Sequence, residues 1–378
     1  MRYPLLIVVI VLFSGCSASR KISHTSAQAS PGQLRLLGEY ILPPGLQVGN
    51  TVVGGLSGID YDSARDRYYV ICDDPSSKGP TRYYTLRIPT SENGIDTVAI
   101  EAVTSLLNAG GEPYADITRD RFHSADVEAL RYDPVRDEMI WSSEGQRNAK
   151  DRMFQNPEIV VMNRDGQRKD SFELPPNLHY SLDEKGPRHN SVFEGLSFDQ
   201  GSNHVYLNVE EPLFEDGPRA GLGDSTAWIR ILKFNRTLRK CVAQFAYQVE
   251  PVPYPANPPG AFKINGVSDI LYLGGDRLLV VERAWSTGRA PSDVRIYVAD
   301  LNGAGDVTNQ PLGKSPPVAP MKKKLLLDFS SVGKFIDNIE GVSFGPPLPN
   351  GHKTLLFVAD DNFSPNQKSQ FLLFEILP

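Results

Sequence analysis

The chain has 378 residues, of which 40% are hydrophobic and 22% charged, and its formal net charge is −6. Nucleic-acid-binding domains present a concentrated positive surface, so this acidic balance argues against nucleic acid as a partner. The basic run Lys322-Lys323-Lys324 begins an apolar stretch and is interpreted as a solvated strand end.

The N-terminus has the pattern of an export signal. Arg2 is followed by an apolar stretch over residues 5–13 and then by small residues before Cys16. The apolar stretch is shorter than the roughly 20 residues that a membrane-spanning helix needs. The sequence "SGC" at residues 14–16 resembles a bacterial lipobox, which predicts that residues 1–16 are a lipoprotein signal peptide and that Cys16 carries the lipid. Plain secretion with cleavage nearby is the alternative.

The signal is followed by a tether and a large domain. Residues 17–32 are small and polar without apolar periodicity, which predicts a flexible tether. Residues 33–378 are expected to form a single domain that buries a sizeable core. No aspartate follows Cys16 to retain the protein at the inner membrane. The expected location is therefore the bacterial envelope, at the outer membrane on its periplasmic or surface side. We expect a monomer that contacts the membrane only through its lipid anchor.

One unit recurs five times along the rest of the chain, and such internal repeats decide the fold. Each copy has a Glu or Ser, a short strand, a turn signal and a β-rich run that ends in an acidic group. Successive copies are 66 to 74 residues apart. Their first polar residues are Ser57, Glu128, Glu194, Ser268 and Glu340.

Further strand-like runs complete each unit. Two such runs, rich in β-branched and aromatic residues, follow in each of the first four units. The fifth unit has only one, at residues 370–377, and the stretch "QLRLLGEYILP" from Gln33 supplies the missing strand. Four strands per unit, completed by an N-terminal strand, are typical of a β-propeller that closes its ring. We therefore predict an all-β, five-bladed β-propeller, with six blades as the alternative.

Each unit is longer than the about 40 to 50 residues of an ordinary blade, and the surplus lies in loops. Long loops on a rigid scaffold are where functional residues concentrate. The loops cover residues 106–124, 175–190, 211–225, 251–262 and 303–320. Cys72 and Cys241 lie in strand-like surroundings of different units, which favours two separate thiols over one disulfide.

Five ordered stretches between about Leu56 and the C-terminus carry a family resemblance. They are "DVEALRYD", "NSVFEGLSFD" with "NVEEPL", "NGVSDILYL" with "LLVVER", "NIEGVSF" and "VADDNF". Together they resemble the bacterial family called "esterase-like activity of phytase". The last motif of that family reads Asp-Asn-Asn-Phe, and Asp361 takes the place of the first Asn here. The resemblance implies an exported β-propeller with esterase- or phosphatase-type activity, and it assigns no catalytic residue.

The acidic residues of the repeats are expected to gather at one end of the channel. Equivalent positions of the innermost strands converge on the axis, and antiparallel pairing brings the start of one strand beside the end of the next. The first set comprises Glu128, Glu194 and Glu340, with Asp126 just upstream. The second set ends the second strands and comprises Asp73, Asp74, Glu144, Glu210, Glu211, Glu282, Asp360 and Asp361.

So many neighbouring carboxylates repel one another unless a cation compensates them. Ca²⁺, which takes about 6–8 oxygen ligands, suits such a site, and another hard divalent cation is the alternative. The predicted ligands are Asp73, Glu128, Glu144, Glu210, Glu211, Glu282, Asp360 and Asp361. Side-chain amides at matching strand ends could contribute, namely those of Asn190, Asn265, Asn338 and Asn362. The histidines lie in loops without the spacing of zinc ligands.

Glu194, Glu340 and Arg283 are the candidate catalytic residues. A carboxylate could act as base toward a metal-bound water, and the planar guanidinium of Arg283 suits a phosphate or carboxylate. Arg147 follows another acidic position and is a second candidate for that contact. A nucleophilic serine is not expected because the chain lacks a G-x-S-x-G elbow. Alternatively, the repeated acids hydrogen-bond the strand backbones of neighbouring blades.

These features predict an exported, metal-dependent hydrolase of phosphoesters or small esters that acts at an acidic ring on one end of the channel. Its partner would be a small phosphorylated or ester substrate. Two alternatives stay open. One is a non-catalytic propeller that binds a ligand or protein through its loops, and the other is a lactonase-like hydrolase that needs the same metal.

Overall fold

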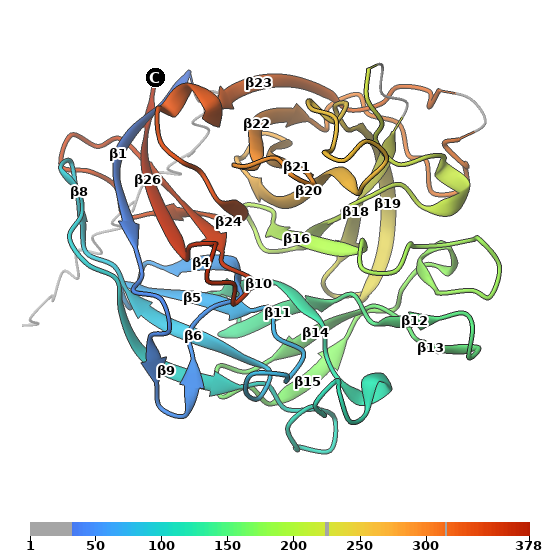
Figure 1. Ribbon diagram of the computed structural model, residues 1–378, viewed down its shortest axis with the longest axis horizontal. Coiled ribbons are helices and arrows are strands. Elements are labelled where there is room, and N and C mark those ends of the chain that lie inside the picture. Colours follow the sequence, from blue (N-terminus) through green and yellow to red (C-terminus); the bar gives the residue numbers. More distant parts are fainter. Residues whose placement is uncertain (1–31, 224–226, 314–315) are drawn as a thin grey trace, which may run out of the picture.

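The structure is a computed structural model that describes residues 32–223, 227–313 and 316–378. Within these residues, five four-stranded antiparallel sheets form a ring around a central axis (Figure 1). The predicted five-bladed propeller is confirmed, and the described residues form no sixth blade. The predicted signal peptide, the predicted lipidation site Cys16 and all of the predicted tether except Gly32 lie outside the described residues. In the described part of the chain, no helix is long and apolar enough to cross a membrane.

The two innermost strands of each blade come from the recurring unit. The innermost strands are β4 (Leu56–Asp62), β10 (Val127–Asp133), β16 (Phe193–Phe198), β20 (Lys263–Tyr272) and β24 (Asn338–Gly345). Their antiparallel partners are β5 (Arg67–Cys72), β11 (Glu138–Ser143), β17 (His204–Val209), β21 (Arg277–Ser286) and β25 (Thr354–Asp360). The innermost strands all run in the same direction along the central axis, so their first residues meet at one end of the channel.

The outer half of each blade follows in sequence. The third strands are β6 (Arg82–Arg87), β14 (Glu158–Met162), β18 (Trp228–Asn235), β22 (Asp293–Asp300) and β26 (Gln370–Leu377). The outermost strands are β9 (Ala99–Ser105), β15 (Arg168–Ser171), β19 (Lys240–Gln248), β23 (Lys322–Asp328) and β1 (Gln33–Ile41). In chain order from β4 to β24, the blades are called the first to the fifth.

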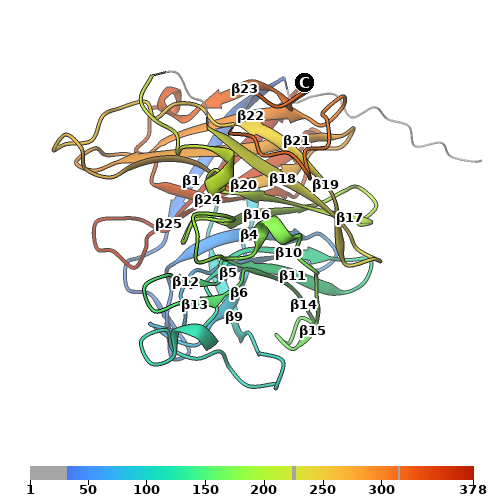
Figure 2. The ribbon, with the colours of Figure 1, turned by 90° about the vertical axis from the view of Figure 1, so that its right-hand side faces the viewer.

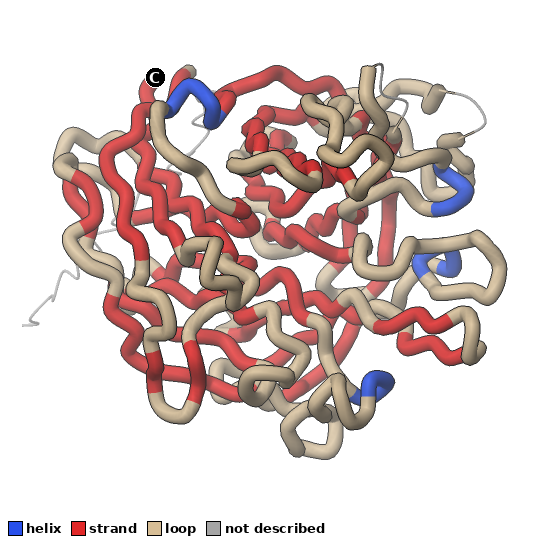
Figure 3. Tube along the Cα trace, viewed as in Figure 1, coloured by secondary structure: helices blue, strands red, loops and turns tan. Residues whose placement is uncertain are grey.

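Short elements decorate the ring, and Figure 3 shows loops lying over the ends of the sheets. Three two-stranded ribbons pair β2 (Gln47–Val48) with β3 (Thr51–Val52), β7 (Thr90–Ser91) with β8 (Gly94–Ile95), and β12 (Gln146–Asn148) with β13 (Met153–Gln155). The helical turns that the structure describes are the 3₁₀ helices η1 (Arg121–His123), η2 (Pro176–Leu178), η3 (Phe214–Asp216) and η4 (Phe329–Val332).

The N-terminal strand closes the ring, as the sequence predicts. β1 pairs with β26 in a register that runs from Gln33 opposite Leu377 to Ile41 opposite Gln370. The edge of β26 is thereby covered, and the two ends of the described chain are held in one blade. Cys72 and Cys241 form no disulfide, and both are free thiols, as the sequence favours.

The core consists of side chains packed between neighbouring blades. Figure 2 shows the stacked blades from the side of the ring. Tyr69 of the first blade meets Tyr132 of the second edge to face, with 5.4 Å between the ring centroids. Trp141 on β11 of the second blade and Phe357 on β25 of the fifth blade are almost completely buried. The aromatic residues of the second strands therefore form inter-blade core, which explains the strand-like runs of the recurring unit.

Glycines let the innermost strands approach one another closely. A Cβ atom on Gly341 would lie 2.5 Å from the carbonyl oxygen of Ser57 in the next blade. On Gly195 it would lie 2.6 Å from the backbone nitrogen of Ile270. Since real Cβ atoms do not come so close to backbone atoms, close backbone approach accounts for these recurring glycines.

Candidate functional site

A cavity of about 820 Å³ opens at the end of the channel where the innermost strands begin. Its floor includes Glu128, Glu194 and Glu340 from the starts of innermost strands, and Asp73 and Glu210 from the ends of second strands. The two acidic sets therefore meet at one end of the channel, because antiparallel pairing reverses the chain between them.

Three of the long loops reach this cavity. Residues 189–191, Arg219 and Phe262 belong to or adjoin the loops 175–190, 211–225 and 251–262, and all line the cavity wall. The loop 303–320 instead packs on the third blade, where Arg230 donates to the carbonyl oxygens of Val307 and Gln310. Three of the long loops therefore contribute residues to the cavity, whereas the loop 303–320 packs against a blade.

Two groups of carboxylates lie close enough to share cations; Asp73, Glu128 and Glu194 line the floor of the cavity, and Asp126 and Glu144 lie against these three. In the first, ligand atoms of Glu128, Glu144 and Glu194 all lie within 4.8 Å of one another. In the second, the same holds for Asp73, Asp126 and Glu128. Glu144 follows β11 and Asp126 precedes β10, so the groups are built where the first three blades meet.

These carboxylates accept few hydrogen bonds from the rest of the protein. The side chains of Glu128 and Glu194 are 6% and 7% exposed, and among the described residues neither accepts a side-chain or backbone hydrogen bond. Glu144 Oε1 accepts from the backbone nitrogen of Val192, but its buried Oε2 has no partner. Burial, reinforced by the neighbouring carboxylates, raises the pKa of all three groups well above the usual range. Protons or a cation must therefore compensate this half of the floor.

The other half of the floor carries its own positive charge. Arg283 Nη2 lies 3.1 Å from Glu210 Oε1 and 3.5 Å from Glu340 Oε1. Asn338 Nδ2 donates to the same oxygen of Glu340 over 2.7 Å. Although burial opposes its charge, the surrounding carboxylates of Glu340, Glu210 and Glu194 raise the pKa of Arg283. Arg283 thus forms ion pairs in one half of the floor, whereas no arginine or lysine among the described residues forms an ion pair with Glu128, Glu144 or Glu194 in the other half.

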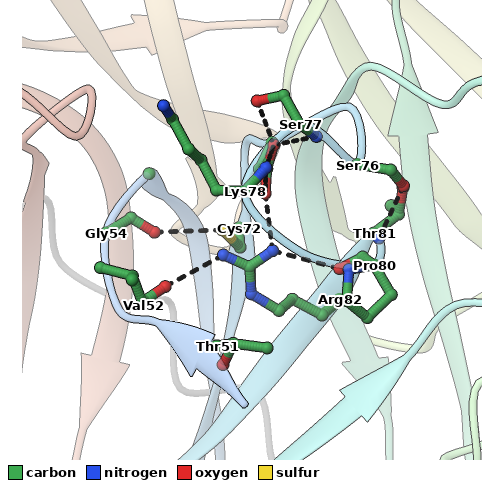
Figure 4. Close-up of polar contacts among 12 residues, drawn as sticks. Thr51, Val52, Gly54, Cys72, Ser76, Ser77, Lys78, Pro80, Thr81 and Arg82 are labelled. Carbon is green, nitrogen blue, oxygen red and sulfur yellow. Dashed lines mark hydrogen bonds and ion pairs between the residues drawn. The ribbon is translucent and has the colours of Figure 1, made fainter. Parts of the chain in front are cut away.

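The acidic doublets at strand ends divide between cavity and framework. Asp73 lines the cavity, whereas Asp74 accepts hydrogen bonds from Ser77 N at 2.7 Å and Arg82 Nη1 at 2.8 Å. Figure 4 shows that Arg82 also reaches the carbonyl oxygens of Val52 and Pro80. Because successive side chains of an extended chain point in opposite directions, only one member of the doublet can face the channel.

The same division holds for the doublet Glu210-Glu211, whereas neither Asp360 nor Asp361 lines the cavity. Glu210 lines the cavity, whereas Glu211 accepts from Ser191 Oγ at 2.6 Å and lies 3.0 Å from Arg219 Nη2. Asp360 is buried beside Glu340, and burial together with Glu340 raises its pKa well above the usual range.

Two predicted ligands accept hydrogen bonds within the framework. Asp361 accepts from the backbone nitrogens of Gly55 and Phe363. Glu282 is surrounded by donors and does not line the cavity. Its partners are Tyr247 Oη at 2.7 Å, Glu250 N at 2.9 Å, Asn265 Nδ2 at 3.0 Å and Lys323 Nζ at 2.6 Å. Metal ligation by Glu211, Glu282 and Asp361 stays a prediction, and in the structure protein groups contact all three carboxylates.

Several residues at the site were not among the predicted ligands or catalytic groups. Asp126 lies two residues before Glu128, and this spacing puts both side chains on the same side of an extended chain. The spacing is the feature of the sequence from which Asp126 could have been predicted as a ligand. Arg219, His189 and Trp285 line the cavity from loops and a strand end, where no periodic pattern marks them. Arg147 does not line the cavity, and its guanidinium lies over the ring of Phe214, 5.4 Å from the centroid.

Solved structures that resemble this chain are low in sequence identity. The endo-arabinase from Bacteroides thetaiotaomicron is 10% identical with a TM-score of 0.44, and the match covers 90% of this chain and 98% of that one. The Bacillus subtilis arabinanase is 12% identical with a TM-score of 0.42, over 85% and 94% of the two chains. The periplasmic gluconolactonase of Pseudomonas aeruginosa is 11% identical with a TM-score of 0.35, over 86% and 90%.

Comparison of the sequence with protein families identifies the family of this chain. No protein with a curated description matches the chain. The model of the Phytase-like family, described as "Esterase-like activity of phytase", matches residues 51–363. That match spans all five of the innermost strands and the acidic floor of the cavity. The chain therefore belongs to the Phytase-like family.

Proposed function

We propose that the protein is a metal-dependent hydrolase of phosphoesters or small esters that acts at the acidic floor of the cavity. One observation carries the proposal: beside a cavity that also presents Arg283, the clustered carboxylates of Glu128 and Glu194 accept no hydrogen bond from the described residues, and Oε2 of the neighbouring Glu144 is buried without a partner. Membership in a family described by esterase-like activity supports hydrolysis as the reaction class.

Calcium fits the donor set. Two oxygens bound to one Ca²⁺ can be at most about 5 Å apart, because each Ca–O distance is about 2.3–2.6 Å. The ligand atoms of Glu128, Glu144 and Glu194 lie within 4.8 Å of one another, which is inside that limit. Another hard divalent cation would use the same oxygens. A bound cation would supply Lewis acidity and make water a stronger nucleophile at neutral pH.

Residues of the chain would supply the general base and the group that binds the substrate. Glu194 lies between the two halves of the floor, since both Glu144 and Arg283 act on its carboxylate. Burial raises the pKa of Glu194, and a raised pKa suits a carboxylate that takes a proton from water near neutral pH. Arg283 would hold a substrate oxyanion, with Glu340 and Glu210 keeping its guanidinium in place.

Elemental analysis and a substrate panel test this function. Purified protein should contain a divalent cation and should hydrolyse phosphoesters or small esters, lactones included as a comparison, in a chelator-sensitive manner. Glu194→Gln should abolish turnover with the fold intact, whereas Glu184→Gln, which removes a charge from an exposed loop, should leave turnover unchanged. Protein without metal and without turnover on the whole panel would overturn the proposal and favour a non-catalytic binding propeller.

We also propose where the protein acts. It would be an exported, monomeric lipoprotein of the bacterial envelope, anchored through Cys16 and facing small phosphorylated or ester substrates, with no nucleic-acid partner. Labelled palmitate should be incorporated into the wild-type protein and not into Cys16→Ser. Equal labelling of both proteins would contradict the anchor, and a dimer in solution would contradict the monomer.

A further inference from the structure

The two carboxylate groups of the cavity floor share one residue, Glu128. The first group lies where the second and third blades meet and consists of Glu128, Glu144 and Glu194. The other lies where the first and second blades meet and adds Asp73 and Asp126 to Glu128. The five ligand atoms fall into two groups rather than one, so a single ion position does not serve all of them.

The five carboxylates also carry more negative charge, when ionised, than one divalent cation can neutralise. One divalent cation balances two carboxylates, whereas two divalent cations balance four of the five. Among the charged groups that act most strongly on these side chains, Arg121 acts on Asp126 and Arg283 acts on Glu194. Glu128, which belongs to both groups, has no arginine among the charged groups that act most strongly on it.

One unpartnered buried oxygen marks the position where the second and third blades meet, and a buried carboxylate without hydrogen bonds from the described residues is common to both positions. Glu128 is 6% exposed and accepts no hydrogen bond from the described residues. Glu144 is fully buried, and its Oε2 has no partner. Asp126 Oδ2 has a single donor, Gln146 Nε2 at 3.0 Å. A carboxylate with two free oxygens between two groups of ligands is placed to bind one cation through each oxygen.

We infer that the floor binds two divalent cations, with Glu128 as the carboxylate that bridges them. One ion would be held by Asp73, Asp126 and Glu128, and the other by Glu128, Glu144 and Glu194. This inference rests on the proposed metal-dependent function of the same site. Pairs of cations about 3.5–4 Å apart are suited to phosphoryl groups, because two oxygens of one phosphoryl group can each contact one ion. The pair therefore favours phosphoesters over carboxylic esters as substrates.

Manganese is a suitable probe because two Mn²⁺ ions at this separation alter each other's electron paramagnetic resonance spectrum. Full-length purified protein, stripped with a chelator and dialysed, would be titrated with Mn²⁺ and with Ca²⁺, and bound metal counted by elemental analysis. The expected result is two ions per chain and a spin-coupled Mn²⁺ spectrum. The wild-type spectrum tests the inference even if a variant fails to fold.

Three variants separate the two positions. Asp126→Asn and Glu144→Gln should each lower the count from two ions to one and abolish spin coupling, because each residue belongs to a single group. Glu128→Gln should weaken both ions. The matched control Glu184→Gln removes an exposed carboxylate and should retain two coupled ions.

The possible results separate this inference from the proposed function. One uncoupled ion per chain, lost equally in Asp126→Asn and Glu144→Gln, would overturn the pair while chelator-sensitive turnover still supported a hydrolase. Two ions without spin coupling would overturn the shared bridge. No bound ion, together with turnover that chelator does not affect, would overturn both.

Discussion

Arg131 Nη2 donates to both carboxylate oxygens of Asp269, over 2.9 and 2.8 Å, across the axis of the propeller. Arg131 comes from β10 and Asp269 from β20, and both side chains are almost completely buried. The guanidinium also donates to the carbonyl oxygens of Ile59 on β4 and Val342 on β24. One arginine therefore joins four of the five innermost strands and fills the channel beneath the acidic floor.

Removal of this arginine should destabilise the whole ring. Arg131→Met leaves the carboxylate of Asp269 buried without its partner, and breaking such a pair costs about 3–5 kcal/mol. Chemical denaturation should show that loss in the free energy of unfolding. Arg119→Met is the control, because the side chain of Arg119 is 86% exposed and lies 3.8 Å from Asp116. Equal stability of the two variants would contradict a structural role for the central pair.

A methyl group on an inner strand should also be costly. Gly195→Ala would place its Cβ 2.6 Å from Ile270 N and 2.7 Å from Asp269 Cα, so two blades would have to separate. Overpacking of this kind costs about 1–3 kcal/mol. The measurement is the midpoint of urea unfolding. Gly221→Ala, whose Cβ would meet nothing within 4 Å, should change that midpoint little.

Stability without metal should fall as the pH rises. Burial raises the pKa of Asp126 to about 6 and that of Glu210 to about 7. In the unfolded chain both groups titrate near pH 4, at about their ordinary values. Between about pH 4 and 7 the folded protein therefore holds protons that the unfolded chain releases, and raising the pH through this window lowers the free energy of unfolding.

Calcium should replace those protons. Its addition should raise the thermal unfolding midpoint slightly at about pH 5 and strongly at about pH 8, where the carboxylates of the metal-free protein repel one another. Thermal scans with calcium and with chelator at both pH values measure the difference. A calcium effect of the same size at both pH values would argue against cation binding at these carboxylates.

Arg283 should matter for turnover more than for binding. Removal of a positioned donor to a developing charge typically lowers kcat by about 10²–10³-fold, and Arg283→Met should fall in this range. Arg283→Lys should recover part of the loss, because it keeps the charge without the planar fork. Steady-state kinetics separate kcat from KM. An unchanged kcat with reduced thermal stability would show that Arg283 serves only as ion-pair partner of Glu210 and Glu340.

The sequence predicts the ring and its acidic end because these depend on repetition. Glu128, Glu194 and Glu340 occupy the same position of the repeat, so closure of the ring is enough to bring them together. The doublets are different. Whether Asp73 or Asp74 faces the channel depends on how the chain leaves β5, and the hydrogen bonds of Arg82 that hold this exit join residues distant from the motif.

Loop residues at the site are beyond prediction from the repeat. Arg219 lines the cavity wall and forms an ion pair with Glu211, and no periodic pattern in the sequence records that pairing. The ligand role of Asp126 has a weak signal, its spacing of two residues from Glu128. The separation of the floor into a half with ion pairs to Arg283 and a half without such pairs appears only once Arg283 is placed beside Glu210 and Glu340.

The register of β1 against β26 determines at which end of the propeller the described chain begins, relative to the cavity. Asn338, opposite Asp360, marks the cavity end of the fifth blade, and β26 starts at that end with Gln370. Gln33 lies opposite Leu377, so the described chain enters the propeller at the end remote from the cavity. The lipid anchor that we propose at Cys16 would therefore connect to the propeller at the end opposite the cavity, and the point of attachment would leave the mouth of the cavity free.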